Sequence, residues 1–373
     1  MKIKVGITGQ EGFVGQHLSL QLRLFPELYE IIAFQRGFFE DEKRLEQFVA
    51  ECDTIVHLAA LNRHNDPDTI YRTNIELVEK LVRALKATDS KAHVLFSSSS
   101  QEEQDNLYGK SKKEGRELFA NWAKEADSLF TGLVIPNVFG AFGNPYYNSF
   151  IATFSHQLTH DEEPKIAQDG VVRLIYVQDL VKQMIEIIRE RNSADLLKIA
   201  FTDEKKVSEV LAMLSNYKEK YLLKGIIPEL NNAFEVNLFN TFRSYIDHKN
   251  RFPVHYVQHT DPRGAFVEVI RLEVGGQVSF STTVPGVTRG NHYHSRKIER
   301  FSVIKGKALI QLRKIGTDDV MDFYLDGSEP SYVDMPIWYT HNIKNIGEEE
   351  LYTVFWINEF YNEDDPDTYF EAV

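Results

Sequence analysis

Residues 2–18 join a short apolar run, a glycine-rich turn and the start of a helical pattern: KIKVGITGQEGFVGQHL. Gly9, Gly12 and Gly15 follow the apolar run directly, and residues 13–25 have helical spacing. Small residues at such a junction let the backbone approach a pyrophosphate, which then lies at the helix N-terminus. Glycines also serve tight turns and close helix packing, so the junction predicts a nucleotide site only together with the elements that follow.

Apolar runs of strand length alternate with helical patterns as far as residue 136. The strand-like runs lie at 30–36, 53–60, 93–100 and 129–136, and the helical patterns at 45–52, 73–87 and 109–126. Strands that alternate with helices predict an α/β Rossmann-type fold, a doubly wound parallel sheet.

The run at 30–36 ends in Gln35 and Arg36 and has no carboxylate at its tip. A carboxylate there commonly binds the ribose hydroxyl of NAD, whereas a cation suits the extra phosphate of NADP. Arg36 therefore favours NADP, with a solvated surface arginine as the plainer alternative.

The pattern changes after about residue 245. Strand-like runs separated by Gly, Pro and Asp turns occupy 255–286, 301–316 and 350–361, without a long helical period. Several short strands in succession predict an antiparallel barrel or jelly roll. A chain of 373 residues suits two domains, and we place the boundary near residue 246, giving an α/β domain of residues 1–245 and an all-β domain of residues 246–373.

Composition argues against several classes of function. The chain has 42 Lys and Arg against 55 Asp and Glu, and this net charge of −13 disfavours nonspecific binding to nucleic acid or to anionic membranes. The single Cys52 permits no intrachain disulfide and is expected to be buried filler, not a nucleophile. Because neither a signal-peptide pattern nor an apolar stretch of membrane-spanning length occurs, we expect a cytoplasmic protein without membrane insertion.

Tyr108 and Lys112 are four residues apart in a predicted helix, so both side chains lie on one face. An ammonium and a bound cofactor near a phenol can lower its pKa, which lets the tyrosine act as an acid or base. The serine run from Ser97 to Ser100, at the end of the preceding strand, offers a hydroxyl to a substrate oxygen. A lone Tyr-x-x-x-Lys pair is common. When it follows a glycine loop and a strand that ends in serines, in that order, it predicts a catalytic group.

A candidate metal site lies in residues 285–306, PGVTRGNHYHSRKIERFSVIKG. His292 and His294 are two residues apart and project to the same side of a strand, and Glu299 is within reach of a short turn. A fourth ligand must come from a distant strand, where His341 is the candidate. Three imidazoles and a carboxylate suit one divalent Zn, Fe, Mn or Ni ion, and we favour Zn.

The first half of the chain resembles the extended short-chain dehydrogenase/reductase family, whose members act mostly on nucleotide-linked sugars. The similarity rests on TGxxGxxG, HLAA, the serine strand end, YGKSK, PNVFG at 136–140 and VQDL at 177–180. It implies that Tyr108 is the catalytic acid/base, with Lys112 as its partner and as the clamp on the cofactor ribose. Ser99 is implied as the third member, with Ser98 open because four serines blur the register, and Asn74 matches a structural asparagine of the family.

The same resemblance implies a set of residues around NADPH. These are Thr8, Gly9, Gly12, Phe13, Val14, Gly15, Arg36, Leu58, Ala59, Lys112, Pro136 and Val138.

One departure separates the chain from the sugar-nucleotide dehydratases of that family. Those enzymes follow the catalytic hydroxyl with an Asp-Glu pair that moves the C5 proton and expels water, whereas Ser100 and Gln101 stand there in this chain. A net reductase is therefore favoured. The segment between Arg36 and Asp53 is also too short for the family's usual extra strand, which leaves the adenine-side contacts open.

The spacing from Gly286 through the histidine pair and Glu299 to Gly306 is similar to the first motif of the cupin family at every fixed position. This agreement argues against a pair of surface histidines. The second cupin motif is less complete, because Trp338 and Pro330 stand where glycines are expected, so His341 is the least firmly implied ligand.

Residues 261–271 and 288–294 also resemble the 3,5-epimerases of deoxysugar nucleotides, cupins that remove a proton beside a 4-keto group through an enolate. In them the histidine that corresponds to His292 is a free base and no metal is needed, so the two roles exclude each other at His292. A metal here is then a Lewis acid at the C4 carbonyl or a structural ion. Lys297, Tyr332 and Tyr339 are alternatives for moving the proton.

A reductase followed by a cupin with this signature resembles the bifunctional enzymes of capsular polysaccharide synthesis over nearly the whole chain. The resemblance implies an NADPH-dependent homodimer on the route to UDP-N-acetyl-L-fucosamine. The cupin domain would epimerise C3 of a UDP-2-acetamido-2,6-dideoxy-4-hexulose, and the reductase domain would reduce C4 to the L-talose product. Two alternatives are a simple reductase with a sugar-binding or dimerising cupin module, and a nucleotide-sugar sensor with an inactive reductase fold.

Overall fold

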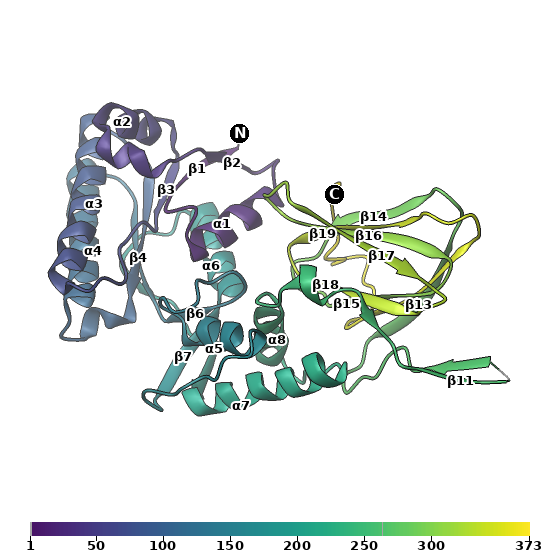
Figure 1. Ribbon diagram of the computed structural model, residues 1–373. Helices are drawn as coiled ribbons and strands as arrows, with labels where there is room; N and C mark the ends of the chain where they lie inside the picture. The colour runs from purple at the N-terminus through teal and green to yellow at the C-terminus, as the bar shows by residue number, and fades with distance from the viewer. Residues whose placement is uncertain (1, 263) are drawn as a thin grey trace. The chain divides into compact units, whose positions relative to one another are not determined.

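The computed structural model describes residues 2–262 and 264–373 and divides the chain into two compact units (Figure 1). The first unit comprises Met1–Thr153 with Ala167–Val207, and the second comprises Phe154–Ile166 with Ser208–Val373. The boundary expected near residue 246 falls inside the second unit, because helices before it bond to the strands after it. The Asn240 amide, for example, donates to the carbonyl oxygen of Arg296 at 2.9 Å. A functional boundary near 246 stays a prediction.

Six parallel strands form the sheet of the first unit in the order β2-β1-β3-β4-β5-β8. Their bounds are β1 (Ile3–Thr8), β2 (Tyr29–Ile32), β3 (Thr54–His57), β4 (His93–Ser99), β5 (Phe130–Ile135) and β8 (Ala194–Lys198). Strands β3 and β5 are buried along their whole length, as expected where helices cover both faces of a parallel sheet.

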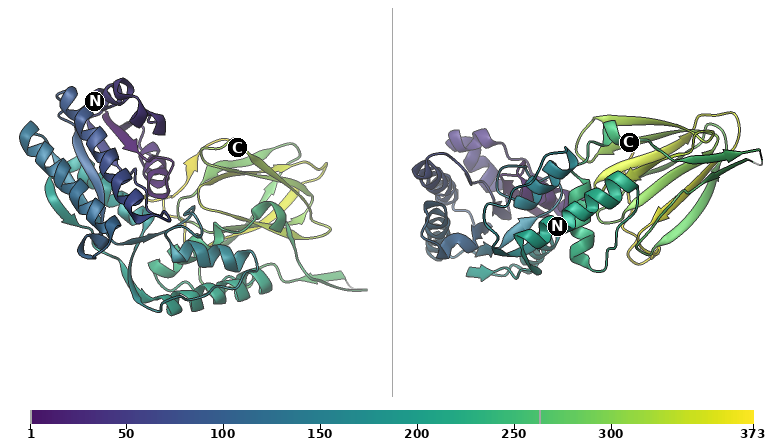
Figure 2. Two further views of the ribbon diagram at one scale, coloured as in Figure 1. Left: turned by 60° about the vertical axis from the view of Figure 1, so that its left-hand side comes forward. Right: turned by 60° about the horizontal axis from the view of Figure 1, so that its bottom comes forward.

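Helices flank this sheet on both sides (Figures 1 and 2). Helices α1 (Phe13–Arg23) and α6 (Val177–Glu190) lie on one face, and α2 (Glu42–Glu51), α3 (Pro67–Ala87) and α4 (Leu107–Ala126) lie on the other. The predicted Rossmann-type parallel sheet is confirmed.

The strand predicted at 30–36 is too long. Strand β2 ends at Ile32, and Arg36 begins a 3-10 helix that runs to Glu40. Phe34 lies after the end of the strand, where it is buried and packs on Phe48 with ring centroids 4.9 Å apart. As the length of the segment implied, residues 33–53, all of which the structure describes, contain no further strand.

A small three-stranded sheet completes the first unit. Its strands, in the order β6-β7-β9, are β6 (Asn137–Phe139), β7 (Val171–Tyr176) and β9 (Asp203–Lys206). Helix α5 (Phe150–Thr159) follows β6 in the chain, and the VQDL motif forms the first turn of α6 directly after β7.

Two five-stranded antiparallel sheets form the β-rich part of the second unit, in the orders β10-β18-β15-β20-β13 and β17-β16-β19-β14-β21. Val303 and Val333 from one sheet share a core with Ile310 and Ile343 from the other. The strands are β10 (Val254–His255), β13 (Gln277–Thr283), β14 (Thr288–Tyr293), β15 (Glu299–Lys305), β16 (Lys307–Lys314), β17 (Val320–Asp326), β18 (Ser331–Met335), β19 (Tyr339–Asn345), β20 (Leu351–Ile357) and β21 (Tyr369–Phe370). The predicted antiparallel β domain agrees with this arrangement, and its assignment as a cupin jelly roll stays a prediction.

A helical segment precedes these sheets within the second unit. It contains α7 (Val207–Tyr217), a π-helix (Lys218–Leu223), α8 (Ala233–Arg243) and α9 (His248–Arg251), and the hairpin β11 (Gln258–Asp261) and β12 (Gly264–Val267) follows. Arg300 and Asp334 form a buried ion pair with two N···O distances of 2.7 and 2.9 Å. The Tyr221 hydroxyl of the π-helix donates to the same carboxylate at 2.6 Å, which ties the helical segment to the sheet.

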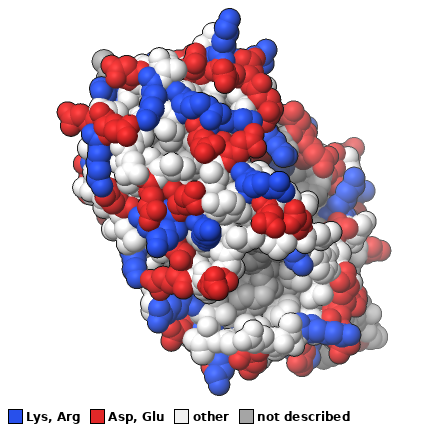
Figure 3. Space-filling view, turned by 90° about the vertical axis from the view of Figure 1, so that its left-hand side faces the viewer, with Lys and Arg blue, Asp and Glu red and all other residues white. Residues whose placement is uncertain are grey.

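Several charged side chains on the outer helices of the first unit form ion pairs. Lys80 lies 2.8 Å from Glu76, and Lys86 lies 2.7 Å from Glu125. Figure 3 shows acidic and basic side chains interspersed on the face that it draws. Among the described residues, none of the helices combines the length and the apolarity that a bilayer crossing requires.

Candidate active site and candidate metal centre

The glycine loop lies between the end of β1 and the N-terminus of α1. Gly9 has a φ of +78°, and a Cβ there would lie 2.8 Å from the backbone nitrogen of Ala59. A Cβ at Gly15 would lie 2.3 Å from the carbonyl oxygen of Gly9. Gly12 caps α1 without a side-chain hydrogen bond, so the first amides of the helix remain available to an anion. The loop therefore fits a pyrophosphate.

The other residues predicted around NADPH lie close to the carboxyl ends of the parallel strands. Thr8 ends β1, Phe13 and Val14 begin α1, Leu58 and Ala59 follow β3, and Pro136 and Val138 follow β5. Arg36 is exposed, and the Gln10 side chain donates to the carbonyl oxygen of Phe34 at 3.2 Å, which links the Arg36 segment to the glycine loop. These ends share one edge of the sheet, where dinucleotides bind in such folds.

Tyr108 and Lys112 lie one turn apart at the start of α4. Lys112 is 3% exposed, and its Nζ donates to the carbonyl oxygen of Ser97 at 2.9 Å. The same Nζ lies 5.8 Å from the centroid of the Tyr108 ring. The Ser99 hydroxyl lies close enough to the Tyr108 side chain to act on its pKa as a hydrogen-bond partner. The three residues implied as the catalytic group thus come together in the structure.

Ser98 and Ser99 have different partners. Whereas Ser99 contacts Tyr108, the Ser98 hydroxyl donates to Glu102. Glu102 also pairs with Arg116 at 2.8 Å, and both of these side chains are at most 10% exposed. This geometry favours Ser99 over Ser98 as the third member of the catalytic group.

Glu102 is also the first carboxylate after Ser100 and Gln101, the positions at which dehydratases carry their Asp-Glu pair. Both of its oxygens accept hydrogen bonds from Arg116, at 2.9 and 2.8 Å. A carboxylate committed to such a bidentate pair is poorly placed to move a substrate proton. Glu102 is therefore no substitute for the dehydratase pair.

Burial sets the protonation of the catalytic group. It raises the pKa of Tyr108 to about 12, with a smaller rise from Tyr147 and an opposing effect of the Ser99 hydrogen bond. Burial lowers the pKa of Lys112 to about 8, against an opposing effect of Glu102. Burial therefore dominates the pKa of Tyr108 in the protein alone, and the lowering expected with the cofactor bound stays a prediction. A phenol that keeps its proton can donate it to a forming alkoxide.

Asn74 and Gly109 hold the catalytic helix in place. The Asn74 side chain accepts from the Leu61 amide at 2.7 Å and donates to the Ser111 hydroxyl at 3.1 Å, which joins the loop after β3 to α4. A Cβ at Gly109 would lie 2.0 Å from the carbonyl oxygen of Gln101. The YGKSK glycine therefore lets α4 approach the serine loop closely enough for Tyr108 to reach Ser99.

The four predicted metal ligands converge in the second unit. His292 lies in β14 and pairs with His341 in β19, and His294 follows β14 directly. Glu299 begins β15 in the other sheet. One ligand atom from each of the four residues lies within 4.8 Å of the others.

The donor geometry fits one divalent cation. Oε2 of Glu299 lies 3.0 Å from Nε2 of His294 and 3.4 Å from Nε2 of His341. Four donors at roughly 2.0–2.1 Å from a tetrahedral zinc ion lie about 3.3 Å from one another. These three atoms are buried and face one another, so a cation between them would satisfy all three.

Hydrogen bonds fix the tautomers of two of these histidines. Nδ1 of His294 donates to the carbonyl oxygen of Asp367, and Nδ1 of His341 donates to that of Tyr339 at 3.3 Å. The Nε2 lone pairs of both rings are therefore directed at Glu299, as metal ligation requires.

The charges within this cluster depend on one another. Burial, together with smaller effects of the neighbouring His341 and His294, lowers the pKa of the half-buried His292 to about 4. Burial also lowers the pKa of His294, but the Glu299 carboxylate outweighs it, and the net shift is upward. Burial raises the pKa of Glu299, and the two histidines outweigh it, so the net shift is downward. Both shifts favour a positive charge beside the ionised Glu299, which is the charge that a bound cation would supply.

The structure gives other contacts to the three alternative proton carriers. Nζ of Lys297 donates to the carbonyl oxygen of Pro366 at 2.5 Å. The Tyr332 ring lies 3.7 Å from the guanidinium carbon of Arg300, within the core of the second unit. Tyr339 is also packed against that core, and burial raises its pKa to about 12.

Known proteins resemble both halves of the chain. Residues 5–200 match the NAD dependent epimerase/dehydratase family, and residues 259–369 match the polysaccharide biosynthesis C-terminal domain. The chain is 31% identical over 371 residues to the UDP-2-acetamido-2,6-beta-L-arabino-hexul-4-ose reductase of Pseudomonas aeruginosa, covering 98% of each protein. It is 30% identical over 123 residues to the spore coat polysaccharide biosynthesis protein SpsL of Bacillus subtilis, covering 30% of this chain and 80% of that protein.

The chain belongs to the NAD dependent epimerase/dehydratase family, and its cofactor is accordingly a nicotinamide dinucleotide. Along its full length it is similar to a more particular protein. The crystal structure of the capsular polysaccharide assembling protein CapF from Staphylococcus aureus matches 100% of both chains, with 32% identity and a TM-score of 0.64. The predicted relationship to reductase enzymes of capsular polysaccharide synthesis is confirmed.

Proposed function

We propose that the chain is a bifunctional, NADPH-dependent nucleotide-sugar enzyme of surface polysaccharide synthesis. The second unit epimerises C3 of a UDP-2-acetamido-2,6-dideoxy-4-hexulose, and the first unit reduces C4 to give UDP-2-acetamido-2,6-dideoxy-L-talose. The observation that carries this proposal is the Ser99–Tyr108–Lys112 group in a chain with full-length similarity to a reductase of a UDP-linked hexul-4-ose.

The reductase half of the proposal follows from the protonation of the catalytic group. The bound dinucleotide supplies a hydride to C4. Tyr108, with a pKa raised to about 12, holds its proton at neutral pH and gives it to the oxygen on which negative charge develops. The Ser99 hydroxyl, which contacts Tyr108, orients the same oxygen. The Lys112 ammonium stabilises the phenolate that remains.

The preference for NADPH over NADH is supported by charge. Arg36 is exposed and lies two residues after Phe34, whose carbonyl oxygen accepts from the Gln10 side chain of the glycine loop. Gln35, the residue before Arg36, has no carboxylate. A guanidinium there favours the additional ribose phosphate of NADP.

The epimerase half of the proposal rests on the metal cluster. A cation held by His294, Glu299 and His341, with His292 as a fourth ligand, would polarise the C4 carbonyl as a Lewis acid and so acidify the proton on C3. Zinc suits three imidazoles and one carboxylate. His292 is the least buried of the four and has a pKa lowered to about 4, so it is neutral and able to bind a cation or accept a proton.

The two activities form a consistent sequence. Epimerisation needs the ketone, because the ketone acidifies the neighbouring C–H bond. Reduction removes the ketone and thereby fixes the new configuration at C3. An epimerase and a 4-ketoreductase on one chain therefore act in this order.

A homodimer is part of the same proposal. Strand β13 is an edge strand, and it exposes Val278 and Phe280 by 58% and 71%. An apolar sheet edge of this kind is commonly covered by a second chain.

The second candidate function is a single-activity reductase whose β-rich unit binds sugar or dimerises. It is favoured by the name of the full-length relative, which mentions a reductase alone.

Proton NMR of candidate UDP-linked 4-keto sugars in deuterated water, with and without NADPH, tests the proposal. We expect loss of the H3 signal without NADPH, and a reduced product carrying deuterium at C3 with it. Reduction without any deuterium at C3 would support the single-activity reductase. The absence of both exchange and reduction with all of these sugars would contradict both functions.

A further inference from the structure

Residues 365–371 run beside the first two metal ligands. Strand β21 pairs with β14, so that Phe370 lies opposite His292 and Tyr369 lies opposite Tyr293. The Glu371 amide donates to the carbonyl oxygen of Asn291 at 3.0 Å. The segment thus extends the sheet that carries His292 and His341.

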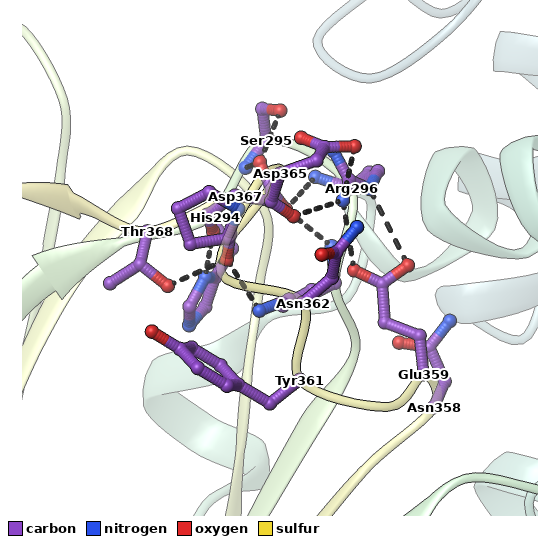
Figure 4. Close-up of polar contacts among 12 residues, drawn as sticks. His294, Ser295, Arg296, Asn358, Glu359, Tyr361, Asn362, Asp365, Asp367 and Thr368 are labelled. Carbon is purple, nitrogen blue, oxygen red and sulfur yellow. Dashed lines mark hydrogen bonds and ion pairs between the residues drawn. The ribbon is translucent and has the colours of Figure 1, made fainter.

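Asp367 connects this segment to the turn between β14 and β15. Its carboxylate accepts hydrogen bonds from the backbone amides of Ser295, Arg296 and Lys297, each at 3.0 Å, and from the Ser295 hydroxyl at 2.6 Å. Asp367 is 1% exposed, and Figure 4 shows it among its partners. A buried carboxylate satisfied by four donors holds a turn rigidly, because loss of any one bond leaves a buried polar group unpaired.

The backbone of the same residue holds a metal ligand directly. The carbonyl oxygen of Asp367 accepts from Nδ1 of His294, which fixes the tautomer and the orientation of the ring. The turn that its carboxylate fixes begins after His294 and leads to Glu299. Asp367 therefore governs the separation of two ligands whose atoms lie 3.0 Å apart.

The conformation of Asp367 is unusual. Its φ is +38°, in a region that favours glycine, so the surrounding contacts hold the residue there. A second contact secures the same segment, because the buried Lys297 donates through Nζ to the carbonyl oxygen of Pro366. Lys297 is thereby engaged by the segment, which argues against its role as the proton carrier of the epimerase.

We propose that residues 365–371 and the metal ion bind to the β-rich unit as one coupled system, with Asp367 as the positioning residue for His294 and Glu299. This inference rests on the proposed metal site. Because coupling between two binding events is reciprocal, the segment raises the affinity for the metal, and the metal strengthens the docking of the segment. No local pattern marks this role, since Asp367 is 73 positions from His294 in the chain.

The test compares Asp367→Gly with Asp367→Asn and a matched control. Glycine keeps the backbone carbonyl and tolerates the positive φ, so only the carboxylate is lost. Asparagine keeps one acceptor oxygen but cannot accept at its amide nitrogen. Asp364→Asn is the control, because Asp364 is an exposed carboxylate directly before the segment.

The measurements are the Zn²⁺ affinity of the full chain, by competition with a chelator, and the visible absorption of the Co²⁺-loaded protein. We expect Asp367→Gly to weaken Zn²⁺ binding by about 10- to 100-fold and to change the Co²⁺ spectrum, with a smaller effect of Asp367→Asn. Asp364→Asn should match the wild type. In the wild type, hydrogen exchange of residues 365–371 should slow when Zn²⁺ is added, a result that needs no variant to fold.

Equal Zn²⁺ affinity and equal Co²⁺ spectra in the wild type and Asp367→Gly would overturn the coupling and leave the metal site intact. Equal rates of hydrogen exchange in the segment with and without Zn²⁺ would also overturn the coupling. A wild-type chain that binds neither ion would instead overturn the metal site of the proposed function, and the coupling with it.

Discussion

The ammonium group of Lys112 donates a hydrogen bond to the backbone carbonyl oxygen of Ser97 at 2.9 Å, inside the first unit. Burial lowers the pKa of this group from 10.5 to about 8. Because the pKa in the folded protein is the lower one, Lys112 carries its charge below about pH 8 and loses it above. We therefore expect kcat/KM for ketone reduction to fall as the pH rises through about 8.

The pH profile of kcat/KM with NADPH and a 4-keto sugar nucleotide measures this effect. Lys112→Arg is the control, because a guanidinium keeps its charge throughout the range and should remove the alkaline limb, whatever its absolute activity. A wild-type profile that stays level to about pH 10 would show that the ammonium does not assist Tyr108.

The two neighbouring serines should differ in their effect on catalysis. Ser99→Ala removes the hydroxyl beside Tyr108 and the acceptor of the Gln101 amide, and we expect kcat to fall by about 10- to 100-fold with a loss of about 1 kcal/mol of unfolding free energy. Ser98→Ala removes a bond to the buried Glu102 and should cost about 1 kcal/mol of unfolding free energy while kcat is retained. Steady-state kinetics and urea unfolding of both variants decide which serine is catalytic. A fall in kcat in Ser98→Ala but not in Ser99→Ala would make Ser98 the catalytic serine.

Local periodicity was enough to predict the parallel sheet and the catalytic helix. The strand–glycine–helix junction and the Tyr108–Lys112 pair depend on residues close in sequence, and the structure places them as their spacing indicates. The His292–His294 pair was readable for the same reason, because alternate residues of a strand share a face.

Features that depend on distant contacts could not be predicted in this way. Strand β2 stops at Ile32, and Phe34 beyond it packs on Phe48, a contact that only the folded chain brings together. The raised pKa of Tyr108 reflects burial, which the position of a lysine in a motif does not reveal. The contacts of Asp367 likewise come from a residue far along the chain with no motif around it.

The buried ion pair between Arg300 and Asp334 should dominate the electrostatic contribution to the stability of the second unit. Asp334→Asn leaves the Arg300 guanidinium buried and uncompensated, and we expect a loss of about 3–5 kcal/mol in unfolding free energy. Glu349→Gln is the control, because its pair with Lys305 is 61% and 57% exposed and should change stability by less than about 1 kcal/mol. Similar urea midpoints for the two variants would contradict the structural role of Asp334.

Metal removal should destabilise the second unit selectively. A cation present at a free concentration of 100 times its Kd for the folded site adds about 2.7 kcal/mol to the unfolding free energy. A chelator removes the cation and with it this contribution. We expect the thermal unfolding midpoint of the Zn²⁺-loaded wild type to fall after chelation. Glu299→Gln, which loses the carboxylate of the cluster, should show almost no such shift. Wild-type midpoints that are equal with and without chelator would argue against a metal in this site.

The division of labour between the two sites is tested most directly by deuterium incorporation at C3 in Tyr108→Phe and His292→Ala, with the UDP-linked 4-keto sugar in deuterated water. Tyr108→Phe should reduce NADPH oxidation by about 100-fold or more and still exchange the C3 proton at the wild-type rate. His292→Ala should lose the exchange and still oxidise NADPH when given the already epimerised 4-keto sugar. Loss of exchange in Tyr108→Phe, or wild-type exchange in His292→Ala, would contradict the assignment of the two steps to two sites.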